Sequence, residues 1–365
     1  MTTMPDFGAA AVPSRRARIA IAVAVALAAG ALSLVWSAKL PDLVSDFDHL
    51  WYAARVAVHG GNPYAVIGPG RAFDYAWVEH YPAPAILLVA AIAAWLPLLA
   101  TRAAFIGLSS GALAYGATRD GYGRLPLFLS GSFFMAVTAT QWSPLITAMA
   151  LCPALAALAI AKPNLGAAVT LAPLDRRAVI AAVVGGVVLS AASLVFIPGW
   201  PAAWLANVRG TGHFVAPIRH AAGPLLLLAL LRWRRPEARL LLAMACVPHT
   251  TMVYETLELF VVARRRVETM LLALLSWVAW VSQIFLNPRV PLGPGGSLMT
   301  DPRYAAYVHD VGDVTLALMY LPCLIIVLRR PNEGTVPAWL ARAARGGEAL
   351  VRPLLTRARA ARPGA

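Results

Sequence analysis

The sequence predicts an all-α polytopic membrane protein with a bundle of about 10–12 transmembrane helices. Hydrophobic residues make up 59% of its 365 positions and charged residues only 13%, which is more apolar surface than a water-soluble core of this length would bury. Apolar runs recur along the chain, and arginine clusters stand at their ends. The clusters are Arg15, Arg16 and Arg18; Arg176 and Arg177; Arg232, Arg234 and Arg235; Arg264, Arg265 and Arg266; Arg329 and Arg330.

The net charge of +14 follows these clusters, as the positive-inside bias of membrane proteins requires. We therefore expect contacts with membrane lipids and no binding of nucleic acid. The cysteines Cys152, Cys246 and Cys323 lie far apart inside apolar runs, which indicates neither a disulfide framework nor a metal cluster. No Walker, dinucleotide, haem or zincin motif is found, so the sequence predicts no cofactor and no metal.

The first apolar run, about 19–38, follows a basic cytoplasmic leader at 1–18 and is long enough to cross a hydrocarbon core of about 30 Å. A cleaved signal peptide is the alternative, but its apolar region usually has about 7–15 residues. The longer run favours an uncleaved anchor. The next segment, about 39–81, then lies outside the membrane.

The remaining apolar runs predict the other crossings of a transmembrane domain that spans 19–330. They lie at about 82–99, 103–117, 125–140, 143–161, 164–174, 178–197, 221–231, 238–248, 251–263, 268–286 and 311–328. One crossing each leaves both termini cytoplasmic and the arginine clusters on the inner side, whereas Arg119 and Arg124 fall outside. The basic tail at 331–365 carries a candidate amphipathic helix near 338–351.

Three of these runs, 164–174, 221–231 and 238–248, have only about eleven residues and cannot span a bilayer as straight helices. Prolines stand at or near their ends. We therefore expect broken helices whose free backbone groups line a cavity enclosed by protein.

Acidic residues are rare in this chain, and several gather just after the first apolar run. Asp46 and Asp48 stand at the start of a segment, 48–58, that carries Trp51 and Tyr52 and predicts a short amphipathic helix along the membrane. Either aspartate suits a helix cap. At the mouth of a cavity, a carboxylate could instead take a proton from an incoming hydroxyl, which is worth ~10²–10⁴ in rate.

Asp46-Phe47-Asp48 has the spelling of a metal-binding motif. However, Mg²⁺ would need further carboxylates or a nucleotide diphosphate to complete its ligands, so we expect a metal-free mechanism.

Lys162 lies between two apolar runs, where a charge costs ~2.5–3.5 kcal/mol at mid-membrane. It either snorkels to the interface or binds an anion. The order of crossings puts Lys162 and His249 on the same outer side as Asp46. Glu255 and Glu258, inside an apolar run, either pair with an arginine or border the cavity.

An ordered set of short motifs separated by apolar runs resembles glycosyltransferase family 87. The set is Asp46-Phe47 with Trp51-Tyr52 and Ala54, then Gly60-Gly61-Asn62-Pro63-Tyr64, then Tyr81-Pro82 with Pro84, then Gln141, then Lys162-Pro163. The resemblance runs from about 40 to 260. That family comprises integral-membrane GT-C enzymes such as polyprenyl-phosphate-mannose-dependent mannosyltransferases.

The resemblance implies a GT-C-like bundle whose first outer loop carries short membrane-parallel helices. It also implies transfer, with inversion, of mannose or another hexose or pentose from a polyprenyl-phosphate carrier to the hydroxyl of a lipid or glycan acceptor. The reaction would take place on the outer face of the bacterial cytoplasmic membrane.

By this analogy Asp46 would be the catalytic base. Asp48 is a second candidate for the base, and His249 matches the later family pattern only loosely. Lys162 and Asn164 would bind the donor phosphate, although Asn164 equally suits a helix cap. The candidate substrate-binding residues are Tyr52, Asn62, Tyr64, Arg71, Glu79, His80, Tyr81 and Gln141.

Two other classes of protein fit the same composition. A transporter or lipid flippase also has broken helices and buried acids, but its polar residues should lie at the midplane of several helices. In this chain they cluster in the first outer loop and at outer helix ends. A catalytically inactive subunit of an envelope assembly is the other alternative.

Overall fold

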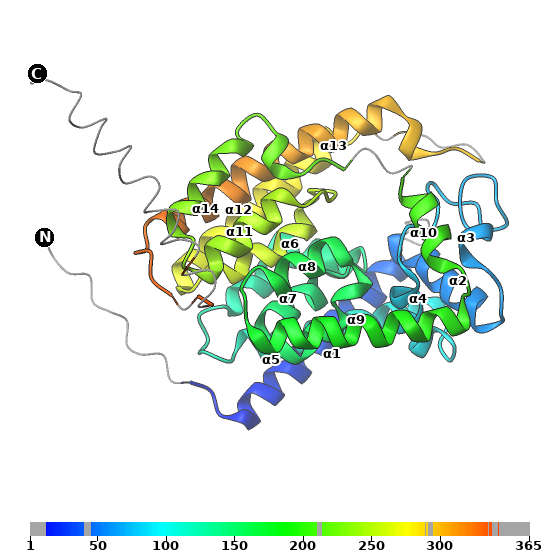
Figure 1. Ribbon diagram of the computed structural model, residues 1–365, viewed down its shortest axis with the longest axis horizontal. Coiled ribbons are helices and arrows are strands. Elements are labelled where there is room, and N and C mark those ends of the chain that lie inside the picture. Colours follow the sequence, from blue (N-terminus) through cyan, green and yellow to red (C-terminus); the bar gives the residue numbers. More distant parts are fainter. Residues whose placement is uncertain are drawn as a thin grey trace, which may run out of the picture.

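The computed structural model describes residues 12–39, 45–209, 214–288, 290, 295–334, 336–337 and 342. Within these ranges the chain is helical and contains no β-strand, as predicted (Figure 1). The amphipathic helix expected near 338–351 and most of the basic leader lie outside the described residues. The first helix already begins at Arg15, inside the segment predicted as leader.

Among the described residues, five helices are long and apolar enough to cross a membrane. They are α1 (Arg15–Lys39), α5 (Leu98–Ala117), α9 (Arg176–Phe196), α12 (Arg266–Leu286) and the continuous segment Pro302–Leu328. That last segment consists of α13 (Pro302–Thr315), a π-helical turn η7 (Leu316–Tyr320) and α14 (Leu321–Leu328). Along α9, valines such as Val187 and Val195 are exposed. A helix of this length with an exposed apolar surface is suited to lipid, so the chain is a membrane protein.

Shorter helical segments bounded by prolines build the rest of the bundle. They are η1 (Leu125–Leu129), α6 (Gly131–Thr138), α7 (Ser143–Leu151), η2 (Pro153–Ala161), α8 (Pro163–Leu171), η4 (Gly223–Arg232), α11 (Pro236–Cys246) and η5 (Val253–Val261). Several begin with proline in the first turn, where its fixed φ and missing N–H cost nothing. The prediction of broken helices is confirmed.

The segments η2, η4 and η5 are 3₁₀ helices of nine or ten residues. A 3₁₀ helix rises about 2.0 Å per residue, against about 1.5 Å in an α-helix. A short segment in this form therefore reaches further through the bundle than an α-helix of the same number of residues.

Helices α1 and α5 pack closely and antiparallel, because glycines remove the side chains between them. A Cβ added to Gly107 would lie 3.0 Å from the Ala26 carbonyl oxygen, and one on Gly30 would lie 3.1 Å from the Ala103 carbonyl oxygen. At the far end, the Arg18 Nη2 donates to the Tyr115 carbonyl at 2.7 Å. The end of α5 therefore lies beside the start of α1.

This packing corrects the predicted position of Arg119 and Arg124. Both follow α5 and lie at the same end of the bundle as Arg15–Arg18, not at the opposite end. Gly123 in the same loop lies against the Arg264 carbonyl oxygen. All the basic loops of this region therefore gather at one end, and the charge conflict of the sequence-based topology disappears.

The error arose in α4 (Ala83–Ala93), which was predicted as a crossing at 82–99. This helix lies along α2 (Asp46–Val58), where the Trp51 Nε1 donates to the Leu96 carbonyl at 3.3 Å. The chain thus enters and leaves α4 at the same end of the bundle. Conversely, the run at 143–161, predicted as one crossing, is divided at Cys152 into α7 and η2.

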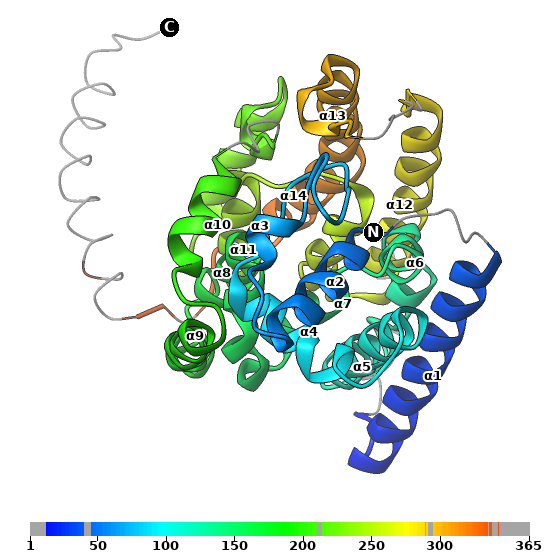
Figure 2. The ribbon, with the colours of Figure 1, turned by 90° about the vertical axis from the view of Figure 1, so that its right-hand side faces the viewer.

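The two ends of the bundle differ in chemistry. At one, the basic end, Glu237 is buried and pairs with Arg264, Arg235 and Arg330. At the other, the site end, lie α2, α3 (Pro63–Val66), the start of α4 and α10 (Trp200–Val208). Figure 2 looks onto the site end, with α1 beside α5 at one edge and α9 at another.

Candidate functional site

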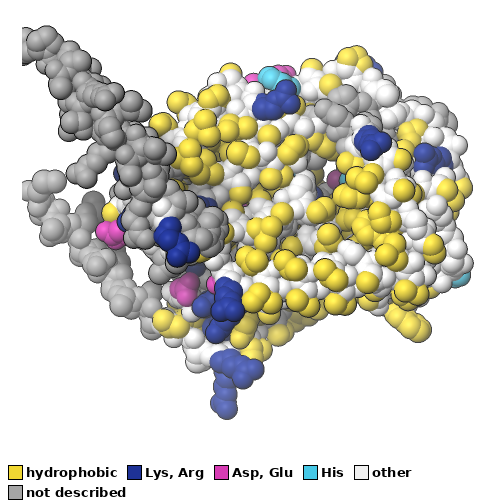
Figure 3. Space-filling view, viewed as in Figure 1, with side chains coloured by type: hydrophobic (Ala, Val, Ile, Leu, Met, Phe, Trp, Pro, Cys, Tyr) yellow, Lys and Arg dark blue, Asp and Glu magenta, His cyan; other side chains and the backbone are white. Residues whose placement is uncertain are grey.

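A cavity of about 360 Å³ lies at the site end and is called the site cavity below. Six segments that are distant in sequence contribute to its wall. Of the residues predicted from the sequence, it is lined by Asp46, His80, Tyr81, Gln141, Lys162, Asn164 and His249. Figure 3, in the view of Figure 1, shows a hollow in the surface between α8 and α10, with charged side chains deep in the hollow and hydrophobic ones around it.

Asp46 lies in the first turn of α2, at the wall of the site cavity. The Ser45 hydroxyl caps this helix by accepting from the Phe47 N–H and donates to the Ala139 carbonyl at 2.6 Å. Asp46 Oδ2 accepts a hydrogen bond from Gln141 Nε2 at 3.0 Å. The α6–α7 loop therefore holds the carboxylate in position.

Asp48 has a different environment, although it follows Asp46 by only two residues. Its carboxylate accepts from the Ser45 backbone N–H at 3.1 Å and forms a buried ion pair with Arg102 of α5. It does not line the site cavity. The two carboxylates do not converge on one point, so this Asp-x-Asp spelling does not form a joint metal site.

Lys162, between η2 and α8, pairs with Glu255 of η5. The distance from Lys162 Nζ to Glu255 Oε1 is 2.5 Å, and Glu255 also accepts from the Thr250 N–H at 2.8 Å and hydroxyl at 2.6 Å. Glu255 lines the cavity and pairs with a lysine rather than with an arginine. An ammonium has three donors, so this pairing leaves two N–H groups of Lys162 for another acceptor.

His249 is buried with both ring nitrogens engaged. Nδ1 lies 2.7 Å from the Val247 carbonyl, and Nε2 lies 2.9 Å from the Tyr320 hydroxyl. Because a carbonyl only accepts, Nδ1 carries the proton and Nε2 accepts from Tyr320. In this arrangement His249 fixes the loop to η7 and has no nitrogen free for acid–base chemistry.

Asn164 links α8 to the same loop, since its Nδ2 donates to the Pro248 carbonyl at 3.0 Å. It makes no side-chain cap of α8. Asn164 therefore does not cap the helix, although the sequence left that role open.

A buried His–Glu pair lies behind the cavity, and of its two members the sequence predicted only Glu79 as a site residue. His49 Nδ1 lies 2.9 Å from Glu79 Oε2, both side chains are fully buried, and Glu79 Oε1 accepts from the Tyr81 N–H. Burial opposes both charges, but their mutual attraction raises the pKa of His49 and lowers the pKa of Glu79. Glu79, predicted to bind substrate, instead holds Tyr81 at the cavity wall. No local pattern joins residues thirty positions apart, which is why sequence reasoning missed His49.

His80 lines the cavity itself. Burial, reinforced by the charge of the neighbouring His49, lowers the pKa of His80 to about 4. Its ring is therefore neutral near neutral pH and can both donate and accept.

Four other predicted substrate-binding residues build the loop behind the cavity and do not line it. The Tyr52 ring stacks on Phe73, and Asn62 caps α3 by accepting from the Tyr64 N–H. The Tyr64 hydroxyl donates to the Tyr81 carbonyl at 2.9 Å, and Arg71 donates to the Tyr64 carbonyl at 2.6 Å. These contacts support Tyr81 from outside.

Two threonines beside the cavity have a strained backbone. Thr140 and Thr251 both have φ of 51° and are adjacent to cavity residues Gln141 and Thr250. A β-branched residue with positive φ is a genuine outlier, at a cost of ~1–3 kcal/mol, and such positions cluster at functional sites.

Comparison with known proteins finds no relative of this chain. No family model matches this chain, no curated protein matches it, and no solved structure matches it.

Proposed function

We propose that this protein is a membrane glycosyltransferase that moves a sugar from a polyprenyl-phosphate carrier to the hydroxyl of a lipid or glycan acceptor. The observation that carries the proposal is that a carboxylate, Asp46, and an ammonium, Lys162, line one cavity at the end of the bundle opposite the arginine clusters. A lone base and a cation are what this reaction needs, because a proton must leave the acceptor and a phosphate anion must leave the sugar.

In this mechanism Asp46 takes the proton of the acceptor hydroxyl. The oxygen attacks the anomeric carbon from the face opposite the phosphate, the bond to the phosphate breaks, and the configuration inverts. Lys162 donates its two remaining N–H groups to the departing phosphate, while Glu255 keeps the ammonium in position. Gln141 orients the base through its hydrogen bond to Asp46.

The apolar part of the cavity wall suits an isoprenoid. Trp204 of α10 and Phe214 line it, and the Trp204 Nε1 donates to the His80 carbonyl at 2.8 Å, which fixes the ring. His80 and Tyr81 also line the cavity, and their polar groups suit sugar hydroxyls.

We infer that the basic end faces the cytoplasm, because cytoplasmic loops of membrane proteins carry the excess of lysine and arginine. The site cavity then opens on the outer side of a bacterial cytoplasmic membrane. A GT-C-like bundle of about 10–12 crossings is consistent with long helices alternating with short 3₁₀ and α segments.

The test is release of polyprenyl phosphate from a labelled polyprenyl-phosphate sugar by the purified protein, with a lipid extract as acceptor. Asp46→Asn should lower the rate by ~10²–10⁴ because it removes the general base. The control is Asp120→Asn, an exposed carboxylate at the basic end, which should keep full activity. Robust transfer by Asp46→Asn with an unchanged Tm would show that Asp46 is not the catalytic base.

A transporter or lipid flippase is the second candidate, because Glu255 and Glu258 are buried acids among short, broken helices. It predicts movement of the labelled lipid across a vesicle membrane without release of polyprenyl phosphate. A catalytically inactive assembly subunit predicts neither movement nor release.

A further inference from the structure

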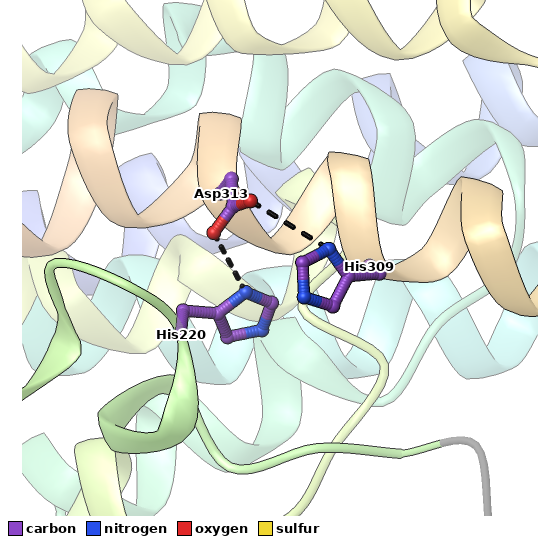
Figure 4. A group of neighbouring side chains, drawn as sticks. All are labelled: His220, His309 and Asp313. Carbon is purple, nitrogen blue, oxygen red and sulfur yellow. Dashed lines mark hydrogen bonds and ion pairs between the residues drawn. The ribbon is translucent and has the colours of Figure 1, made fainter.

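A second polar cluster lies outside the site cavity, where α13 meets the segment after η3 (Pro217–Arg219). It consists of His220, which follows η3, and of His309 and Asp313, one turn apart on α13 (Figure 4). His220 Nδ1 lies 2.9 Å from Asp313 Oδ1, and His309 Nδ1 lies 3.6 Å from Asp313 Oδ2. One ligand atom from each residue lies within 4.8 Å of the other two.

We propose that these three side chains bind a divalent transition metal ion, with Zn²⁺ as the best fit. Two imidazoles and one carboxylate are a common ligand set for zinc, and three protein ligands leave a fourth position for water. With metal–ligand distances of about 2.0–2.2 Å, the ligand atoms of a tetrahedral site lie about 3.4 Å apart. The present separations are on both sides of that value, so small side-chain movements would close the site.

The backbone of α13 is shaped to admit the His220 ring. A Cβ added to Gly312 would lie 2.1 Å from His220 Cε1, so only glycine leaves room for the imidazole at this point. His220 is buried, whereas His309 and Asp313 are partly exposed. The cluster therefore combines one rigidly held ligand with two ligands that are open to an arriving ion and its water.

The position of the cluster gives the metal a structural task. On a different face of α13, Tyr307 and Val311 pack against Met252 and Tyr254, and Tyr254 lines the site cavity. The segment that carries His220 also carries Phe214, another cavity residue. A metal ion would thus clamp two walls of the cavity together, and this role does not depend on the reaction that the cavity performs.

The experiment uses the full chain, purified in detergent with its affinity tag removed, because tag histidines bind zinc. After treatment with a chelator, the protein is titrated with Co²⁺, followed by its visible absorption, and Zn²⁺ is then added as competitor. We expect one tightly bound ion per chain. We also expect Zn²⁺ to raise the Tm of the wild type, because a ligand that binds the folded state stabilises it.

Asp313→Asn and His309→Gln should each weaken binding at least about tenfold, since even the loss of a residue that only supports a ligand costs about 10–100-fold. His309 is exposed, and an asparagine at 313 keeps an oxygen that can accept from His220 Nδ1, so the Tm without metal should stay near the wild-type value. Gly312→Ala keeps all three ligands but displaces the His220 ring, and it should weaken binding as well. The matched control is His59→Gln, an exposed histidine at the end of α2.

Wild-type protein that binds no Co²⁺ or Zn²⁺ overturns the proposal. So does binding that Asp313→Asn and His309→Gln leave unchanged. A Tm increase that persists in Asp313→Asn would assign the effect to another part of the chain and also contradict it.

Discussion

At the residue scale, Asp46 and Asp48 illustrate how helix geometry assigns different tasks to similar neighbours. Residues two positions apart point to nearly opposite sides of a helix. Asp46 therefore faces the site cavity, while Asp48 faces Arg102 and the cap of its own helix. The helix period places the two carboxylates on different sides, and the contacts with Gln141 and Arg102 decide which of them is the candidate base.

The Lys162–Glu255 pair should be energetically coupled. Removing either partner leaves the other charge buried, which typically costs ~3–5 kcal/mol, whereas removing both leaves neither. We expect Lys162→Met and Glu255→Gln each to lower the free energy of unfolding. The double variant should recover at least ~1 kcal/mol of the summed loss, as measured in a double-mutant cycle. Strictly additive losses would mean that the two groups do not stabilise each other.

The His49–Glu79 pair makes stability depend on pH. The pKa of His49 is raised, so the stabilisation that its charged form contributes is complete below the ordinary value of 6.5. This stabilisation is lost as the pH rises through the raised value. The pKa of Glu79 is lowered, so the stabilisation that its charged form contributes is complete above the ordinary value of 4.5. This stabilisation is lost as the pH falls through the lowered value. The pair therefore stabilises most between pH 4.5 and 6.5.

The measurement compares the Tm of His80→Asn with that of His80→Asn combined with Glu79→Gln. The His80 background is needed because its pKa of about 4 makes the wild type less stable over the same acidic range. The Tm difference should be larger near about pH 5.5 than near about pH 8.5. A difference that is independent of pH would contradict the charged pair.

At the element scale, the contact between α1 and α5 depends on glycines. We expect Gly107→Ile to destabilise the protein by about 1–3 kcal/mol or more, because a side chain there meets the backbone of α1 at 3.0 Å. The control is Leu108→Ile in the same turn, whose side chain is 67% exposed and faces away from the contact. The Tm of both variants in detergent checks this, and an equal Tm for the two would exclude tight packing at Gly107.

Two apolar runs were assigned wrongly as single crossings, namely 82–99 and 143–161. Hydropathy does not distinguish an apolar helix that faces lipid from one that protein encloses, so α4 looked like a crossing. The residues of α4 such as Ile86 and Val89 are buried, whereas α9 exposes most of its apolar side chains. Proline positions would have been the better guide, because Pro153 divides the run that was taken as a single crossing.

At the scale of the whole molecule, the corrected topology is directly testable by cysteine labelling. In a variant without the three native cysteines, His59→Cys and Tyr122→Cys introduce single exposed thiols at opposite ends of the bundle. We expect a membrane-impermeant thiol reagent to label only His59→Cys in intact cells. Both sites should react after the membrane is opened. Labelling of both sites in intact cells would contradict this topology and support the crossing at 82–99 that the sequence predicted.

Only part of the candidate site was predictable from the sequence: seven of the predicted residues line the site cavity, and six others, such as Asp48 and Glu79, do not. Asp46, Gln141, Lys162, Asn164 and His249 all line one cavity, as the sequence led us to expect of residues at outer helix ends. Which of the predicted residues remain open to a ligand was decided by long-range contacts. Tyr320 engages His249 across 71 positions, and Arg102 engages Asp48 across 54.

The sequence by itself determined that this chain is helical, lies in a membrane and separates a basic end from a polar end. Composition and charge clusters are sums over the chain, and they need no knowledge of which helix touches which. Only the tertiary structure decided that α4 stays at one end, that Glu255 pairs with Lys162, and that His220 meets Asp313. Those outcomes depend on contacts between distant residues, and neither local periodicity nor hydropathy encodes such pairings.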